Sequence, residues 1–195
     1  MEILKIALSP YGLLIISAAV LVIGRFVFKK KYLNCFDIIK NNFVCFENSH
    51  GRISIISIFL YFIVPFFISM SLVQIRGLDD TVVNILTIIV SILTSMFFTL
   101  LIFILDMHRR VKYDKDYTES EALISTKVLK ETYYSIMFEI LISVVILIMC
   151  FIELFAKNYY FFSSLIIYYF TFVMLTNLFM ILKKVYKVID KDLKM

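Results

Sequence analysis

Five long apolar runs separate short charged segments, and they constrain the fold of this chain more than any motif. They cover residues 11–28, 53–75, 82–105, 133–155 and 160–182. A run of about 18 or more apolar residues crosses the roughly 30 Å hydrocarbon layer as a helix, because a helix satisfies its own backbone hydrogen bonds in a solvent that offers none. The sequence therefore predicts an all-α, polytopic membrane protein with five transmembrane helices in a single membrane domain, residues 1–195.

The positions of Lys and Arg predict the orientation of these spans, because translocating basic residues is disfavoured. Basic residues concentrate in segments 29–52, 106–132 and 183–195, which share one side if all five runs cross. We expect these segments to be cytoplasmic, with the N-terminus outside and the C-terminus inside. The lysines that follow the first run favour a retained span over a signal peptide. Four spans preceded by an interfacial helix is the alternative.

The net charge of +5 belongs to the segments that flank the spans. Topology and contact with anionic lipids explain this placement, so direct nucleic acid binding is not expected. Cys35, Cys45 and Cys150 have no CxxC spacing, and they predict neither a disulfide nor a zinc site. No HExxH, GxSxG or glycine-rich phosphate loop is present. We therefore expect no enzyme activity, no catalytic residues, no cofactor and no metal.

Two of the cytoplasmic segments predict helices of their own. Between the first two runs, Phe36, Ile39 and Phe43 recur at helical spacing among polar residues, which is typical of an amphipathic helix on the inner membrane surface. This helix either covers the ends of the spans or docks a partner. Before the fourth run, Thr118 begins a capping box, and no Gly or Pro follows through residue 155. The fourth span is thus predicted to be one helix on the order of 55 Å long, offering Leu123 and Val128 to a partner.

Four polar residues of different spans fall at a similar depth in the inner leaflet: Arg25, Thr99, Glu139 and Asn177. A charge at the bilayer centre costs about 2.5 to 3.5 kcal/mol on insertion scales, so polar groups there face the protein interior and find partners. We expect Glu139 to face the bundle, in a polar layer with the other three. Two arrangements remain open for Glu139: an ion pair with Arg25, or a neutral, hydrogen-bonded carboxyl while Arg25 reaches the headgroups.

The third span carries hydroxyl side chains at steps of four, Thr87, Ser91, Ser95 and Thr99. Small hydroxylated residues allow membrane helices to approach closely, so we interpret this stripe as a packing seam. A water-filled path is the alternative. In the second span, Pro65 predicts a kink.

The run TVVNILTIIVSILTSMFFTLLIFILDMHRR, the later KVLKETYYSIMFEILISVVIL and the ending NLFMILKKVYKVID resemble the small multi-span membrane proteins of bacterial anti-phage defence loci, such as the membrane subunit of the Kiwa system. The resemblance implies a homo-oligomer in the bacterial inner membrane that senses infection or damages the membrane, together with a soluble cytoplasmic protein partner. It brings no catalytic residues with it.

These expectations combine into one functional hypothesis and two alternatives. The hypothesis is a sensing and anchoring subunit, surrounded by the lipid bilayer, that oligomerises and recruits a cytoplasmic effector. The surface expected to dock this effector includes Phe36, Ile39, Phe43, Leu123, Val128, Lys183 and Lys187. The alternatives are a pore-forming effector that disrupts the membrane, and a channel for ions or small solutes.

Overall fold

The computed structural model describes residues 16, 35–46, 55–113, 119–155 and 159–192. The chain divides into two compact units, Met1–Asp37 and Ile38–Met195. In the first unit the structure describes only residues 16 and 35–37. Apart from residue 16, the predicted first span lies outside the described residues, and so does Arg25.

All the regular structure in the described residues is helical. In chain order the helices are α3 (Phe36–Val44), α4 (Ile55–Ile58), the π-helix η2 (Phe59–Ile63), α5 (Val64–Ile75), α6 (Asp80–Tyr113), α7 (Glu119–Glu153) and α8 (Phe161–Asp192). Four stretches are long and apolar enough to cross a membrane: Ile56–Ile75, Asp80–Val111, Ser125–Glu153 and Phe161–Asp190. The prediction of an all-α membrane protein is confirmed, and these four helices match the last four predicted spans.

The last three helices extend beyond their predicted spans. α6, α7 and α8 have 34, 35 and 32 residues, and no Gly or Pro occurs in any of them. At a rise of 1.5 Å per residue, each is roughly 50 Å long against a hydrocarbon layer of about 30 Å. The single long helix predicted for the fourth span is confirmed: α7 begins at Glu119, next to the predicted cap.

The second span is irregular around its proline. Pro65 lies in the first turn of α5, directly after the π-helical turn of η2. Because proline has no N–H, the carbonyl one turn earlier loses its usual partner, and a wider π-type turn accommodates this. The hydroxyl of Ser69 donates to the carbonyl of Pro65 at 2.7 Å. Pro65 thus coincides with a change of helix type within the span.

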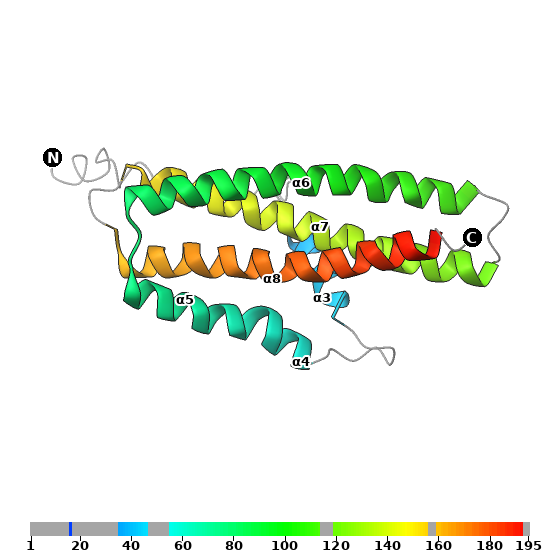
Figure 1. Ribbon diagram of the computed structural model, residues 1–195, viewed down its shortest axis with the longest axis horizontal. Helices are drawn as coiled ribbons and strands as arrows, with labels where there is room; N and C mark the ends of the chain where they lie inside the picture. The colour runs from blue at the N-terminus through cyan, green and yellow to red at the C-terminus, as the bar shows by residue number, and fades with distance from the viewer. Residues whose placement is uncertain (1–15, 17–34, 47–54, 114–118, 156–158, 193–195) are drawn as a thin grey trace. The chain divides into compact units, whose positions relative to one another are not determined.

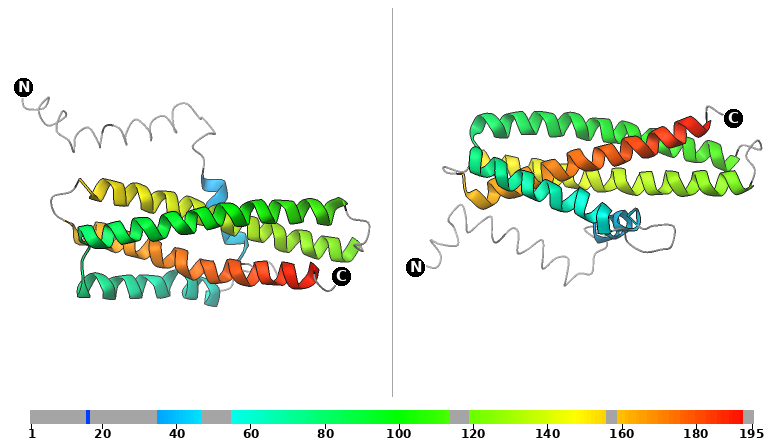
Figure 2. Two further views of the ribbon diagram at one scale, coloured as in Figure 1. Left: turned by 45° about the horizontal axis from the view of Figure 1, so that its top comes forward. Right: turned by 60° about the horizontal axis from the view of Figure 1, so that its bottom comes forward.

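α7 and α8 form the centre of the helix packing. α7 packs against both α6 and α8, while α5 packs on α8 (Figure 1). Figure 2 shows the same neighbours from two other directions. In the most apolar windows of α7 and α8, 50% and 44% of residues are buried, compared with 17% in those of α5 and α6. Polar groups of α7 and α8 are therefore the ones withdrawn from lipid, whereas α5 and α6 keep broad apolar faces exposed.

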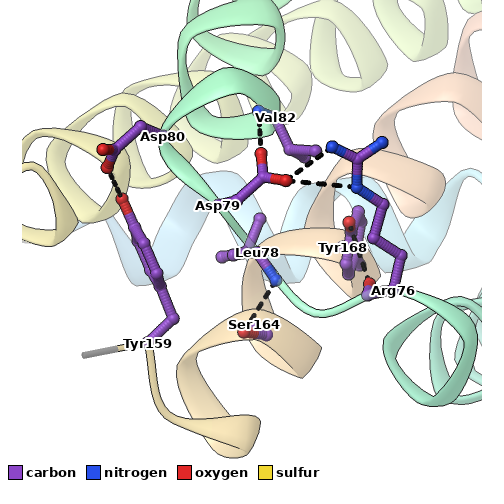
Figure 3. A network of polar contacts seen from close by, with 8 residues as sticks. All are labelled: Arg76, Leu78, Asp79, Asp80, Val82, Tyr159, Ser164 and Tyr168. Atoms are coloured by element: carbon purple, nitrogen blue, oxygen red, sulfur yellow. Dashed lines mark hydrogen bonds and ion pairs between the residues drawn. The ribbon is translucent and has the colours of Figure 1, made fainter.

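An aspartate fixes the start of α6. Asp79 accepts a hydrogen bond from the backbone N–H of Val82 at 2.8 Å, which satisfies one of the free donors at the helix N-terminus (Figure 3). The guanidinium of Arg76 pairs with the other carboxylate oxygen of Asp79, with Nε at 3.2 Å. This hydrogen-bonded pair holds the pKa of Asp79 below its ordinary value. It also raises the pKa of Arg76.

Three hydrogen bonds join the connection between α5 and α6 to the α7–α8 connection and the first turns of α8 (Figure 3). They run from Leu78 N–H to Ser164 Oγ at 3.5 Å, from the Tyr168 hydroxyl to the Arg76 carbonyl at 3.3 Å, and from the Tyr159 hydroxyl to an Asp80 carboxylate oxygen. These two connections therefore lie at one end of the helix bundle. The C-terminal end of α6, the N-terminal end of α7 and the C-terminal end of α8 lie at the other end. This arrangement places the basic segments after residues 105 and 182 at the same end, which we call the basic end.

α3 packs its aromatic side against the start of the second span. The rings of Phe43 and Phe62 stack, with centroids 5.7 Å apart and an interplanar angle of 17°. Phe46 is buried and meets the rings of Tyr61 and Phe62. The predicted helix is confirmed over Phe36–Val44.

Candidate functional site

Glu139 lies at the centre of a polar face on α7. Ser135, Glu139 and Ser143 follow one another at steps of four and are 1%, 0% and 0% exposed. The two serine hydroxyls donate to carbonyls of their own helix, Ser135 to Glu131 at 3.1 Å and Ser143 to Ile140 at 2.8 Å. Neither hydroxyl donates to the carboxyl group. Both oxygens of Glu139 are without a hydrogen-bond partner among the described residues.

Asn177 of α8 faces this carboxyl group across the contact between the two helices. It is 1% exposed, and its amide lies close to the Glu139 carboxyl group. The two groups nevertheless do not meet the geometry of an ordinary hydrogen bond, since the oxygen and nitrogen of the Asn177 amide are also unpartnered. We call these two residues the acid–amide pair.

The donors and acceptors of the acid–amide pair match best when it holds one proton. A carboxylate only accepts, so the Asn177 amide can satisfy just one of its oxygens and leaves its own carbonyl without a donor. A carboxylic acid supplies an O–H to that carbonyl and accepts the N–H in return, which pairs one group with the other completely. Small movements of α7 against α8 can make or break these two bonds. The site can therefore couple the binding of a proton to helix packing.

Toward the basic end, the polar face of α7 continues to an ion pair. Lys184 of α8 reaches Ser135 Oγ with its Nζ at 3.3 Å, and the same Nζ lies 3.9 Å from the Glu131 carboxylate. The side chains of Lys184 and Glu131 are 14% and 30% exposed. Ser135 is one turn from Glu139, so the polar seam of Glu131, Ser135, Glu139, Asn177 and Lys184 is continuous along the α7–α8 contact.

Cys45, just after α3, closes the basic end of this seam. Its Sγ lies 3.3 Å from the backbone carbonyl of Glu131. Burial raises the pKa of the Cys45 thiol, while the charge of Lys184 and a hydrogen bond with Ser135 lower it in part. The segment after α3 therefore contacts the same cluster as the ends of α7 and α8.

The structure brings together two of the four residues expected in one polar layer, Glu139 and Asn177. Thr99 is exposed, and its hydroxyl donates to the carbonyl of Ser95 at 3.1 Å. Arg25 lies outside the described residues, so an ion pair with Glu139 stays a prediction.

The hydroxyl stripe of α6 faces mostly away from the other described helices. Thr87 is half-buried and donates to the carbonyl of Val83 at 2.8 Å, whereas Ser91, Ser95 and Thr99 are exposed. Within the second unit, most of this stripe is not a contact between described helices. A contact with another copy of the chain stays a prediction.

The residues expected to dock a partner have different surroundings. Lys183 and Lys187 are exposed near the end of α8, and Val128 is half-buried on α7. Ile39 and Phe43 are half-buried and pack inside the second unit. Phe36 is 59% exposed. The side chain of Leu123 lies outside the described residues.

Sequence reasoning missed two polar residues of this region. Lys184 belongs to the basic segment 183–195, but it follows Asn177 by seven residues and so shares its face of α8. Asn42 of α3 is 0% exposed, and its amide has no hydrogen-bond partner among the described residues. Nothing in the spacing of Asn42 distinguishes it from the other polar residues of α3.

Comparisons with protein-family models, with curated proteins and with solved structures find no match to this chain.

Proposed function

We propose that this chain is a membrane-embedded sensing and anchoring subunit of a bacterial anti-phage defence system. It sits in the inner membrane, assembles with copies of itself and recruits a soluble effector to its basic end. The proposal rests on the resemblance to membrane proteins of defence loci. The observation that carries it is the acid–amide pair, buried midway along helices that continue to the basic end.

The acid–amide pair has the properties of a sensor element. A buried polar group without a hydrogen bond costs roughly 1–3 kcal/mol, so an unsatisfied pair opposes tight packing of α7 on α8. Ionisable residues within membrane spans commonly mark functional sites for this reason. A stimulus that shifts α7 against α8 changes the bonding of the pair, and the continuous helix α7 carries the shift to the basic end.

The basic end supplies the recruiting surface. Lys183 and Lys187 are exposed there, and Glu131 and Lys184 connect that end to the seam. Self-association uses the exposed side of α6, where the hydroxyls of Ser91 and Ser95 allow close approach of a second helix. The partner is thus expected to be a soluble protein that binds the basic end through an acidic surface.

Phage plating tests the proposal, with the chain expressed from its complete native locus. Glu139→Gln keeps the size of the side chain but cannot exchange a proton, and we expect it to abolish protection. Glu153→Gln is the matched control, because Glu153 is 8% exposed at the other end of the same helix. Exchanging Lys183 and Lys187 together for Glu is expected to abolish protection as well. Full protection by both altered proteins, at wild-type membrane levels, would refute the proposal.

A pore-forming effector is the second candidate, favoured by the exposed hydroxyls of Ser91, Ser95 and Thr99. Several copies that turn this stripe toward one another enclose a polar path. Expression of the chain alone, with a dye that reports membrane potential, separates the candidates. A sensing subunit leaves the potential unchanged, whereas a pore depolarises the cell unless Ser95 is replaced by Leu. Conduction of ions by purified protein in liposomes, without infection or partner, would instead indicate a channel.

A further inference from the structure

A groove opens between α6 and α7 near the basic end. Its volume is about 410 Å³, within the range of roughly 300–1,000 Å³ that is usual for ligand sites. Its apolar lining residues are Ile104 and Leu129, each 1% exposed, and Leu105. The groove lies in the second unit and is lined by described residues of these two helices alone.

The lining changes from apolar to basic along the groove. Ile104, Leu105, Tyr133 and Tyr134 line the membrane-facing end of the groove. Because α7 begins at the basic end, the lining residues nearer that end are His108, Lys130, Leu129 and Thr126. Lys130 is exposed, its Nζ lies 5.8 Å from the centre of the Tyr134 ring, and it makes no ion pair with any described residue. None of the described residues that line the groove is a carboxylate. The donors and the cation thus have no anionic partner within the described part of the protein.

The groove also lies at the expected boundary of the membrane. The apolar run of α6 ends at residue 105 and that of α7 begins at residue 133, so Leu105 and Tyr133 mark the inner edge of the hydrocarbon. Tyrosine rings favour this level, because one end is apolar and the other can hydrogen-bond to headgroups. The end with Ile104 and Leu105 therefore faces acyl chains, and Lys130 faces the headgroup layer.

We propose that this groove binds one anionic phospholipid of the inner leaflet. Its phosphate lies against Lys130, His108 and the tyrosine hydroxyls, and the first part of an acyl chain lies over Ile104 and Leu105. A zwitterionic lipid is bound less well, because its ammonium group brings a second cation next to Lys130. The inference requires that α6 and α7 cross the membrane with the basic end on the cytoplasmic side.

Native mass spectrometry tests this site on the full-length protein from mixed micelles. The micelles contain equal amounts of phosphatidylglycerol and phosphatidylcholine with the same acyl chains. We expect one retained phosphatidylglycerol per chain. Lys130→Gln is expected to reduce its affinity about fivefold, the effect of losing one juxtamembrane charge. Lys127→Gln is the matched control, since Lys127 is exposed on the same helix but does not line the groove.

A second change tests the groove independently of charge. Thr126→Phe fills part of the groove from its polar side and is expected to displace the lipid while leaving the net charge unchanged. Equal retention of the two lipids would overturn the proposal. So would a loss with Lys127→Gln as large as with Lys130→Gln, because binding would then depend on surface charge in general. Undiminished binding to Thr126→Phe would overturn it as well.

Discussion

We predict that Glu139 and Asn177, the acid–amide pair, are energetically coupled, and a double-mutant cycle can measure this coupling. Glu139→Met and Asn177→Leu are nearly volume-conserving, so each removes a polar group without opening a large cavity. Either change alone leaves the other polar group buried and facing a hydrocarbon side chain. With one proton bound, the two groups can satisfy each other, and either change alone removes that partner. Since an unsatisfied buried group costs about 1–3 kcal/mol, we expect each single change to destabilise the protein. With both groups replaced, the free energy of unfolding returns close to the wild-type value.

The size of the coupling energy follows from the burial of the pair. Polar contacts between membrane helices contribute about 0.6 kcal/mol on average and up to about 1.7 kcal/mol. Glu139 and Asn177 are 0% and 1% exposed, so solvent screens their interaction little, and we expect a coupling of about 1 kcal/mol or more. Reversible unfolding in bicelles provides the four free energies of unfolding.

The control cycle combines Asn177→Leu with Thr132→Val. Thr132 is also 0% exposed on α7, but its hydroxyl donates to Val128 of its own helix at 2.7 Å. These two changes are expected to add within about 0.5 kcal/mol, as independent sites do. If the coupling of Glu139 and Asn177 were no larger than that of the control cycle, the two side chains would not act as a pair.

Three further predictions concern the core and the ends of the bundle. Phe97 of α6 is 0% exposed, so we expect Phe97→Ala to lower the free energy of unfolding by about 3–5 kcal/mol. Phe98 is 50% exposed, and we expect Phe98→Ala to have little effect in a parallel unfolding titration. The hydrogen bond to Asp80 raises the pKa of Tyr159 to about 12. The stabilising effect of this hydrogen bond is therefore complete below about pH 10 and disappears as the pH rises through about 12. We expect Asp80→Asn to lower the pKa of Tyr159, as measured by the absorbance of tyrosinate at 295 nm. Burial raises the pKa of Cys45, so maleimide should label it more slowly at pH 7.5 than a model thiol, and an equal rate would contradict the contact with the seam.

Much of the fold follows from the sequence, because the bilayer imposes strict rules on length and polarity. The last four apolar runs are helices in the structure, and the unbroken register before residue 133 correctly predicted the length of α7. Pro65 marked the position of an irregular turn, although not its π-helical form. These features depend on local chemistry along one helix, and this chemistry is readable from spacing alone.

The composition of the site was only half predictable. Depth along the helix axis selected Glu139 and Asn177, which are both buried, but the same depth also selected Thr99, which faces outward. Depth fixes the height of a residue in the membrane, whereas the direction in which it faces depends on the neighbours that its helix packs against. Lys184 was missed for the same reason, since a long side chain near a helix end can reach either water or a neighbouring helix.

Distances between spin labels at the basic end test most directly whether Glu139 controls the packing of α7 on α8. Labels at Lys127 of α7 and Lys187 of α8 occupy exposed positions beyond the seam. We expect Glu139→Gln to shift the distribution of distances between them in liposomes, and Glu153→Gln to leave it as in the wild-type protein. If the distributions of Glu139→Gln and the wild-type protein superimpose, the acid–amide pair does not set the arrangement of the basic end.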